Sequence, residues 1–418
     1  MPALPFRLTI MFFLQFFSWG AWLITLGRYL ANVMNCDGQQ IGYLFATAGI
    51  ASIVMPALLG YIADKWFRAE RVFGCIMLLT AAALLWMGSL SADSSFGTIF
   101  IAILCVNLFF MPSISLSNTI AYSTLGRNGN DIVRIFPNIR VWGTIGFIGA
   151  MWLVDALNVM DSPWQFYISA IATFILGLYS FTIPACYPEG KGKKTGKGIA
   201  AAMGLDALAL FRDKKMAIFF IFSILLGAAL QLTNAYGNMY LDSFKGDSAF
   251  SNSFVVKFPN ILLSLSQISE TLFILTIPFF LKKFGIKTVM ILSFLAWFLR
   301  FGLFGIGDPG FPGWIAFVLS MIVYGMAFDF FNISGSMFVE QATPKELRAG
   351  AQGLFVLMTN GLGTIIGTLA GGAVVKAFQH ETTTNWQPIW FIFAGYALII
   401  GILFSILFRY KQKQPSKN

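Results

Sequence analysis

Charged residues are scarce in this sequence. Of its 418 residues, only 11% are Asp, Glu, Lys or Arg, whereas 57% are hydrophobic and the mean hydropathy is +0.74. A soluble globule of this length needs more polar surface than such a composition provides. The sequence therefore predicts an integral membrane protein.

Residues that carry most enzyme chemistry are equally few. The chain has one histidine, His380, and four scattered cysteines, Cys36, Cys75, Cys105 and Cys186, without metal or redox spacing. It has no HExxH or Gly-x-Ser-x-Gly motif. We therefore expect no enzyme activity, no cofactor and no metal site.

Long apolar runs, in contrast, are abundant. A transmembrane helix needs about 20 apolar residues, and the runs lack the alternating pattern of a membrane β-barrel. The sequence predicts an all-α membrane protein with twelve transmembrane helices. The predicted spans are 8–30, 41–63, 72–90, 98–122, 139–157, 165–183, 216–240, 258–281, 289–306, 314–339, 350–378 and 389–408.

A polar segment divides these spans into two sets of six. It contains PEGKGKKTGKG, which is too polar to cross a membrane. We predict an N-terminal six-helix bundle (1–184), a basic cytoplasmic linker (185–215), and a C-terminal six-helix bundle with a short cytoplasmic tail (216–418).

Basic residues are distributed unevenly over the predicted loops. Most of the 28 Lys and Arg residues fall on one side, which the positive-inside rule assigns to the cytoplasm together with both termini. The anionic leaflet accounts for the net charge of +10, so the expected partner is the lipid bilayer and no nucleic acid is expected.

A basic turn recurs at the same place in both halves. The chain reads GYIADKWFRAERV after the second span and FFLKKFGIKTV after the eighth. We expect Gly60 to permit close helix approach, and Asp64 to meet a helix N-terminus or a basic side chain. The first copy partly resembles the loop signature of the major facilitator superfamily.

Polar side chains inside the spans form narrow seams at helical spacing. Lipid offers them no hydrogen-bond partner, so they must face protein or a wet cavity. Four spans carry such seams: Arg140, Thr144 and Phe147; Gln231, Asn234 and Asn238; Gln267 and Glu270; Tyr324, Phe328 and Asp329.

Each seam also has a purely structural interpretation. Amides commonly bridge packed transmembrane helices, and aromatic residues fill their cores. Buried charges more often mark a pathway or a binding site, which favours a functional role for Arg140, Glu270 and Asp329. Arg300 lies near the outer end of its span, where we expect its side chain to snorkel toward the membrane surface.

The side chains of these seams suit a ligand with several hydrogen-bonding edges and a flat ring. Amides pair with base edges or hydroxyls, carboxylates accept from ribose hydroxyls, and aromatic rings stack on a base. A nucleoside fits this description. A sugar fits the hydroxyl-binding part almost equally, so the residues alone leave both open.

Whole stretches of the chain resemble one family. FPNIRVWGTIGF, SQISETLFILTIPFFL and IVYGMAFDFFNISGS look like segments of bacterial nucleoside:proton symporters, the nucleoside permeases of the major facilitator superfamily. The resemblance implies the major facilitator fold and proton-driven import of purine and pyrimidine nucleosides across the inner membrane by alternating access. It places the substrate pocket on Arg140, Thr144, Phe147, Gln231, Asn234, Gln267, Glu270, Tyr324 and Phe328, with Asp329 beside it.

Counting charges suggests how a proton is coupled. Arg140 against Glu270 and Asp329 leaves one excess negative charge, which one proton neutralises. We expect Asp329 to take this proton and Glu270, with Gln267, to accept ribose hydroxyls, although the reverse assignment stays open. The expected coupling ion is H+ and the expected state a monomer. The alternatives are a proton-coupled sugar or oligosaccharide permease of the same fold, a non-transporting receptor and an intramembrane enzyme.

Overall fold

The computed structural model describes residues 3–129, 131–187, 205–380 and 383–410. Within these ranges the chain is helical, apart from connecting turns and one isolated bridge between Gln379 and Thr384. The all-α prediction is therefore confirmed for the described residues.

Helices of the N-terminal part pack mainly on one another, as do those of the C-terminal part. The first group is α1 (Ala3–Gly20), α2 (Leu26–Asn32), α3 (Gly38–Lys65), α4 (Ala69–Ser89), α5 (Phe96–Arg127), α6 (Ile132–Ala156) and α7 (Trp164–Ser180). The second group is η1 (Leu205–Arg212), α9 (Lys214–Leu230), α10 (Leu232–Ser243), η2 (Phe244–Gly246), α11 (Phe254–Lys257), α12 (Pro259–Ile306), α13 (Gly313–Ala342), η3 (Lys345–Leu347), α14 (Arg348–Val356), η4 (Leu357–Gly363), α15 (Thr364–Ala377) and α16 (Trp386–Leu407).

Every predicted span has a helical counterpart. Nine helices in the described ranges are long and apolar enough to cross a membrane. One of them, α12, contains two predicted spans, which bend apart at Gly285, where φ is 76° and ψ is 166°. Glycine is the residue that adopts such a positive φ without steric cost. The first predicted span corresponds to α1 and α2 together, and the sixth to α7.

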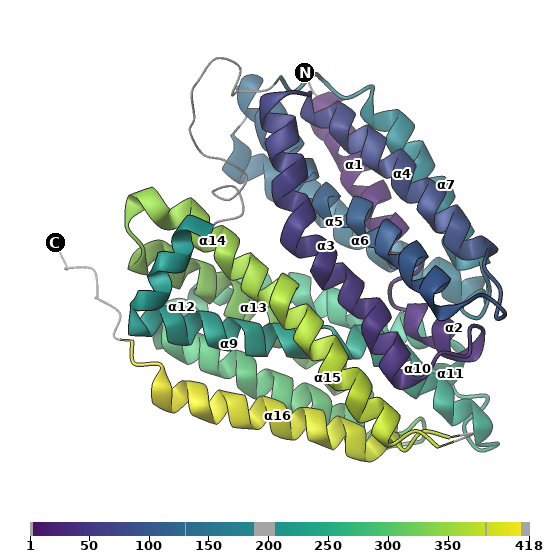
Figure 1. The fold of residues 1–418 in the computed structure, drawn as a ribbon. Helices are drawn as coiled ribbons and strands as arrows, with labels where there is room; N and C mark the ends of the chain where they lie inside the picture. Colours follow the sequence, from purple (N-terminus) through teal and green to yellow (C-terminus); the bar gives the residue numbers. More distant parts are fainter. Residues whose placement is uncertain (1–2, 130, 188–204, 381–382, 411–418) are drawn as a thin grey trace.

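The two groups of helices meet at one end of the molecule. In Figure 1 the ribbons converge where α2, α10 and α11 lie, and they diverge toward the end at which the chain begins and finishes. The predicted boundaries of the linker stay a prediction, because residues 188–204 lie outside the described part of the chain.

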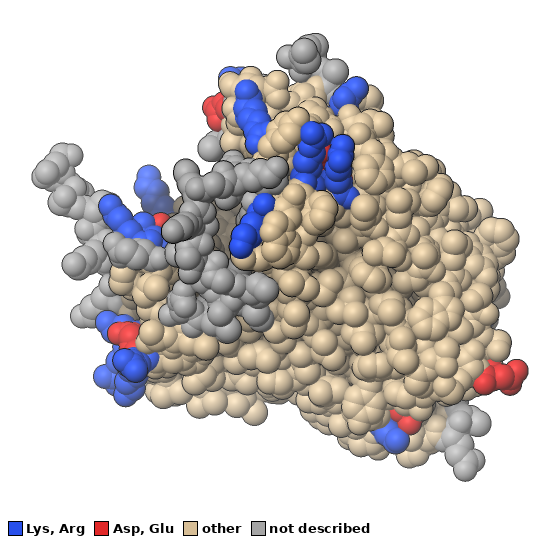
Figure 2. Space-filling model, turned by 45° about the horizontal axis from the view of Figure 1, so that its top comes forward, with Lys and Arg blue, Asp and Glu red and all other residues tan. Residues whose placement is uncertain are grey.

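Lys and Arg side chains are concentrated at the diverging end. Figure 2 shows most of the visible ones around that end, whereas the opposite end shows few. The positive-inside rule assigns the basic end to the cytoplasm. That assignment remains a prediction from charge.

A close approach between the two groups joins α3 to α15. A Cβ atom added to Gly42 would overlap the carbonyl oxygen of Thr368 and lie 3.1 Å from Cα of Gly372. The absence of side chains therefore permits backbone contact between the halves.

Gly60 does not make the close helix approach that the sequence predicts. No atom lies within 4 Å of a Cβ built on it. The reason is that the contact of α3 with the other half extends from Gly38 to Ile53, so Gly60 lies beyond it. The side chain of Asp64 is outside the described part, and its predicted role stays untested.

The contact between α3 and α15 predicts a large difference between two glycine substitutions. Gly42→Ala forces the helices apart, and overpacking of this kind costs about 1–3 kcal/mol. We expect a lower apparent unfolding temperature of the purified protein in detergent, and slower transport. The control is Gly395→Ala on α16, where a Cβ meets no atom within 4 Å. Equal unfolding temperatures for the two variants would show that Gly42 is not needed for the contact between α3 and α15.

Candidate functional site

Helices α12 and α13 bring two of the predicted seams together. The hydroxyl of Ser269 on α12 donates to the carbonyl oxygen of Ile322 on α13, which fixes the two helices side by side. The rings of Tyr324 and Phe328 are parallel within 7°, with centroids 6.0 Å apart. Because Gln267 on α12 and Tyr324 on α13 line the same narrow cavity, the two seams form one surface.

The seam on α6 approaches this surface from the other half. The guanidinium of Arg140 lies 4.1 Å from the ring centroid of Phe16. The buried ring of Phe147 packs edge-on against Trp19, with centroids 6.1 Å apart. Arg140 interacts electrostatically with Glu270, although no N–O distance within 4.0 Å makes them an ion pair. A cation of the N-terminal half thus opposes a carboxylate of the C-terminal half.

The amides on α9 and α10 divide into two kinds. Asn234 Nδ2 donates to Oε1 of Gln231 over 3.1 Å, and both side chains are partly exposed. Asn238 is buried and donates to Oδ1 of Asn260 over 2.7 Å. Asn238 therefore bridges α10 and α12, as its structural interpretation requires, whereas Gln231 and Asn234 are available to a ligand.

A narrow cavity between the halves joins residues from three seams. Asn234, Gln267 and Tyr324 line it from the C-terminal half, and Ile24 and Met151 close it from the N-terminal half. Its free volume is about 10 Å³, enough for roughly one water molecule. The remaining predicted site residues lie outside this cavity. They are Arg140, Thr144, Phe147, Gln231, Glu270, Phe328 and Asp329.

Asp329 is buried, whereas the other two predicted charged site residues, Arg140 and Glu270, are only partly buried. Its relative exposure is 5%, and among the described residues no donor forms a hydrogen bond with its Oδ2. Burying an ionised carboxylate without donors is expensive. This position suits a group that carries a proton.

Arg300 does not snorkel as the sequence predicts. Its relative exposure is 3%, and Nη1 donates to Oγ of Ser266 over 3.2 Å and to the carbonyl oxygen of Ser320 over 3.1 Å. Ser266 lies in the other span of α12 and Ser320 on α13, and together they hold the guanidinium inside the C-terminal half. Arg300 also lines the narrow cavity.

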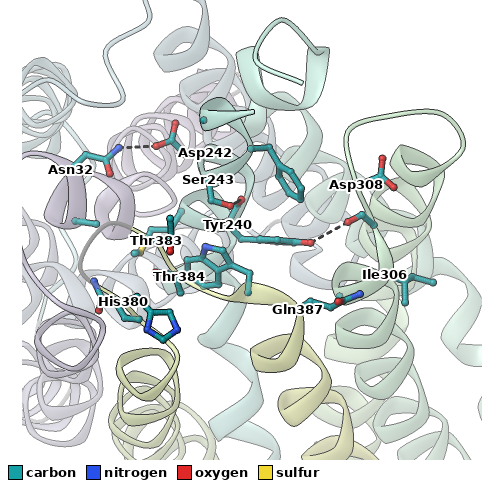
Figure 3. Close-up of a pocket in the computed structure, with 18 residues that line it drawn as sticks. Asn32, Tyr240, Asp242, Ser243, Ile306, Asp308, His380, Thr383, Thr384 and Gln387 are labelled. Atoms are coloured by element: carbon teal, nitrogen blue, oxygen red, sulfur yellow. Dashed lines mark hydrogen bonds between the residues drawn. The ribbon is translucent and has the colours of Figure 1, made fainter. Parts of the chain in front are cut away.

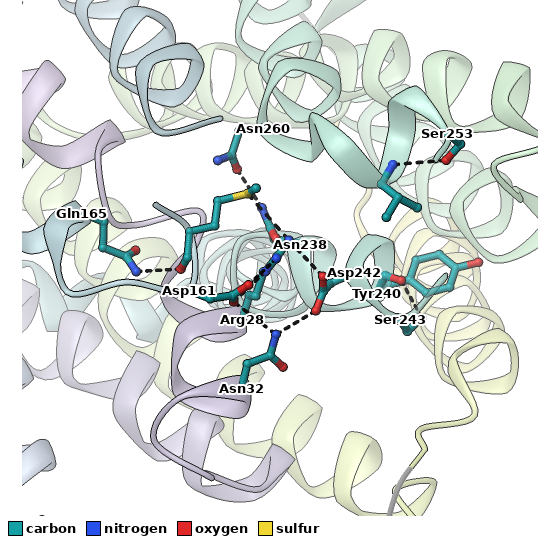
Figure 4. Close-up of polar contacts among 12 residues, drawn as sticks. Arg28, Asn32, Asp161, Gln165, Asn238, Tyr240, Asp242, Ser243, Ser253 and Asn260 are labelled. Atoms are coloured by element: carbon teal, nitrogen blue, oxygen red, sulfur yellow. Dashed lines mark hydrogen bonds and ion pairs between the residues drawn. The ribbon is translucent and has the colours of Figure 1, made fainter. Parts of the chain in front are cut away.

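A charged network closes the converging end of the molecule (Figure 4). Arg28 on α2 forms an ion pair with Asp161, which follows α6, and a second with Asp242 on α10, over 3.1 Å. Asn32 donates to both carboxylates, over 3.2 and 2.8 Å. Since Asp242 belongs to the C-terminal half, the network ties the two halves together.

Sequence reasoning missed this network because Arg28 belongs to none of the polar seams that the helical spacing identifies. The available signal was that Arg28 falls inside the first predicted span, 8–30, where an arginine needs a partner. Its partners could not be identified because they lie more than a hundred residues away in the sequence.

The ion pair with Asp161 does not titrate near neutral pH. Burial alone would raise the pKa of Asp161, but the hydrogen bond and charge of Arg28 outweigh it and hold the pKa below its usual range. A carboxyl group with a lowered pKa stabilises the folded state above its unfolded pKa, and this contribution disappears only as pH falls through the lowered value. The Arg28–Asp161 ion pair therefore persists over the neutral range.

Further contacts between the halves lie near the same end. Oδ2 of Asp155 on α6 accepts from the backbone N–H of Ile261 on α12 over 2.9 Å. Nε1 of Trp152 donates to Oγ of Ser264 over 2.9 Å. Helices α6 and α12 are therefore in contact near the converging end, and their seams lie between this contact and the diverging end.

A larger cavity, of about 800 Å³, lies beside the charged network (Figure 3). Asn32, Tyr240, Asp242, Asp308 and His380 are among its lining residues. None of the predicted substrate residues lines it. It belongs to the converging end and is separate from the seams.

The described ranges contain no candidate metal site. No group of three or more His, Cys, Asp or Glu side chains there could hold an ion, and the four cysteines are free.

Two groups of membrane helices, joined at one end and enclosing a polar seam at their interface, define a secondary transporter of the major facilitator fold. A family model described as "Nucleoside H+ symporter" matches residues 3–413, and the chain belongs to this family. It is thus a transporter and not an enzyme.

Individual relatives agree with this assignment. The chain is 48% identical to the xanthosine permease of Escherichia coli K12, over 99% of this chain and 98% of the relative. It is also 48% identical to nucleoside permease NupG of the same organism, over 98% and 96%. The crystal structure of NupG superposes with a TM-score of 0.91, covering 98% of this chain and 100% of the other. The resemblance and the fold class that the sequence predicts are confirmed.

The charged network predicts that Arg28→Gln opens the converging end. Breaking a buried ion pair by removing one partner costs about 3–5 kcal/mol, since the other charges are left uncompensated. In a variant without native cysteines, spin labels at Asn158 and Ser248 report the separation of the two outer loops. We expect Arg28→Gln to shift their distances to longer values.

The matched control is Arg134→Gln, at an exposed position on α6. It should leave the distances unchanged. If Arg28→Gln and Arg134→Gln gave the same distances as the parent protein, the network would not hold the halves together.

Proposed function

We propose that this chain imports purine and pyrimidine nucleosides together with protons across the bacterial inner membrane, as a monomer with both termini in the cytoplasm and with no cofactor. One observation carries the proposal: a seam of amides, parallel aromatic rings and a carboxylate on one half opposes an arginine of the other half. Membership of the symporter family and the relatives named nucleoside permease and xanthosine permease support it.

Each part of a nucleoside has matching side chains in this seam. The parallel rings of Tyr324 and Phe328 offer a platform on which a base stacks. Gln231 and Asn234 offer donors and acceptors to the base edge. Glu270 accepts from ribose hydroxyls, together with Gln267 one turn earlier on α12.

Residues of α6 complete the site from the opposite half. Arg140 and Thr144 contribute polar groups, and Phe147 contributes an aromatic wall held by Trp19. A substrate that touches both halves favours the state in which the halves are close. Its binding energy then drives the conformational change.

Alternating access follows from how the halves are joined. The converging end is closed by the network of Arg28, whereas the glycine contact of α3 with α15 lets the halves turn against each other. Rocking about the seam would open the converging end and close the diverging one.

Arg300 changes how charges are counted in this mechanism. With its charge included, the two arginines and two carboxylates of the interior sum to zero. The C-terminal half alone, with Arg300, Glu270 and Asp329, carries one excess negative charge. When rocking moves Arg140 away from Glu270, a proton on Asp329 compensates the excess negative charge of the C-terminal half. Glu270 would then stay ionised and bind ribose.

This mechanism predicts that Asp329→Asn uncouples transport from the proton gradient. The amide mimics the protonated acid, so nucleoside still binds and exchanges, but accumulation driven by an imposed pH gradient falls at least tenfold. Uridine counterflow and gradient-driven uptake in proteoliposomes measure the two properties. Glu270→Gln should instead lose both, since it removes a substrate acceptor. Undiminished accumulation by Asp329→Asn would exclude Asp329 as the coupling site.

The substrate class has its own test. In a transport-deficient cell, uptake of radiolabelled uridine should be inhibited by unlabelled adenosine and xanthosine and left unchanged by disaccharides. Inhibition by a disaccharide alone, or uptake of labelled disaccharide, would instead support a sugar permease. No uptake of any labelled solute by a correctly inserted protein would contradict a transport function.

A further inference from the structure

Arg300 carries a buried positive charge that the mechanism above does not place on the substrate. Its side chain is 3% exposed, and no carboxylate in the described part of the chain lies within 4.0 Å of it. All of its hydrogen bonds there go to neutral oxygens: Nε to Oγ1 of Thr233, and Nη1 to Ser266 and Ser320. Burying an ion without a counter-ion is costly, so a structural bridge alone is a weak reason for an arginine at this position.

The guanidinium also faces the substrate seam. Its central carbon lies 4.3 Å from the ring centroid of Tyr324, the residue on which a base would stack. It lines the narrow cavity together with Asn234, Gln267 and Tyr324. Nη2 forms no hydrogen bond with any residue that the structure describes, so the bridge uses Nε and Nη1 and leaves this nitrogen free to donate.

We infer that Arg300 is a further substrate-contact residue, with Nη2 donating to a carbonyl oxygen on the nucleobase. The inference rests on the proposed nucleoside site and extends it to specificity. Nη2, which the bridge leaves free, can donate to O6 of a 6-oxopurine, whereas a 6-aminopurine presents an amino donor in place of O6. The preferred purine class is therefore 6-oxopurine nucleosides.

Inosine and adenosine form the matched pair of substrates, since they differ at this position of the ring. We expect Arg300→Met to lower the kcat/KM of inosine uptake by about tenfold or more, and that of adenosine by less than threefold. Arg300→Lys keeps the charge but cannot hold the bridge and present a planar Nη2 donor at once, and should give an intermediate inosine-to-adenosine ratio. The control is Thr233→Val, which removes one hydrogen-bond partner of the Arg300 bridge. It should lower the kcat/KM of inosine uptake and of adenosine uptake by the same factor.

The outcomes separate this inference from the proposed function. If inosine and adenosine uptake fall by the same factor in Arg300→Met and Arg300→Lys, Arg300 only supports the helices and the inference is overturned. If Arg300→Met is not inserted, the ratio in Arg300→Lys decides, and a ratio equal to that of the wild type overturns it. Failure of the wild-type protein to take up either nucleoside would overturn the proposed function itself.

Discussion

The cost of holding charge in an apolar interior controls this structure. Arg28, Arg300 and Asp329 are buried, and Arg140 and Glu270 are partly buried on membrane helices. An unpaired ion in such a medium is strongly unfavourable, so each needs a counter-charge, a set of dipoles, an aromatic face or a proton. The structure uses all of these. Arg28 has carboxylates, and Arg140 and Arg300 lie against rings, whereas the proposed mechanism assigns the proton to Asp329.

The same constraint distinguishes the converging end, where ion pairs join the two halves, from the centre, where charges of the two halves interact without direct contact. At the converging end, Arg28 keeps Asp161 ionised, so this ion pair holds at neutral pH. In the centre, Arg140 and Glu270 interact without direct contact. Their separation during rocking alters the local charge. Proton binding and substrate binding therefore influence the same movement.

Local patterns predicted more of this protein than did residues whose partners are distant. Apolar run lengths identified the spans, and helical spacing placed Gln267 beside Glu270 and Tyr324 beside Phe328, because both depend only on nearby sequence. Arg300 was misplaced because its acceptors come from α10 and α13, and the network of Arg28 was missed for the same reason. The expectation for Gly60 failed because close approach depends on where two helices cross, which one helix cannot reveal.

Proton movement accompanying nucleoside uptake tests this account most directly. In proteoliposomes of the purified protein, an external pH indicator reports protons that enter when uridine is added without any imposed gradient. The account predicts that the external medium becomes alkaline in proportion to the uridine taken up, and that a protonophore abolishes this change. Uridine uptake at the same rate with no change in external pH would contradict it.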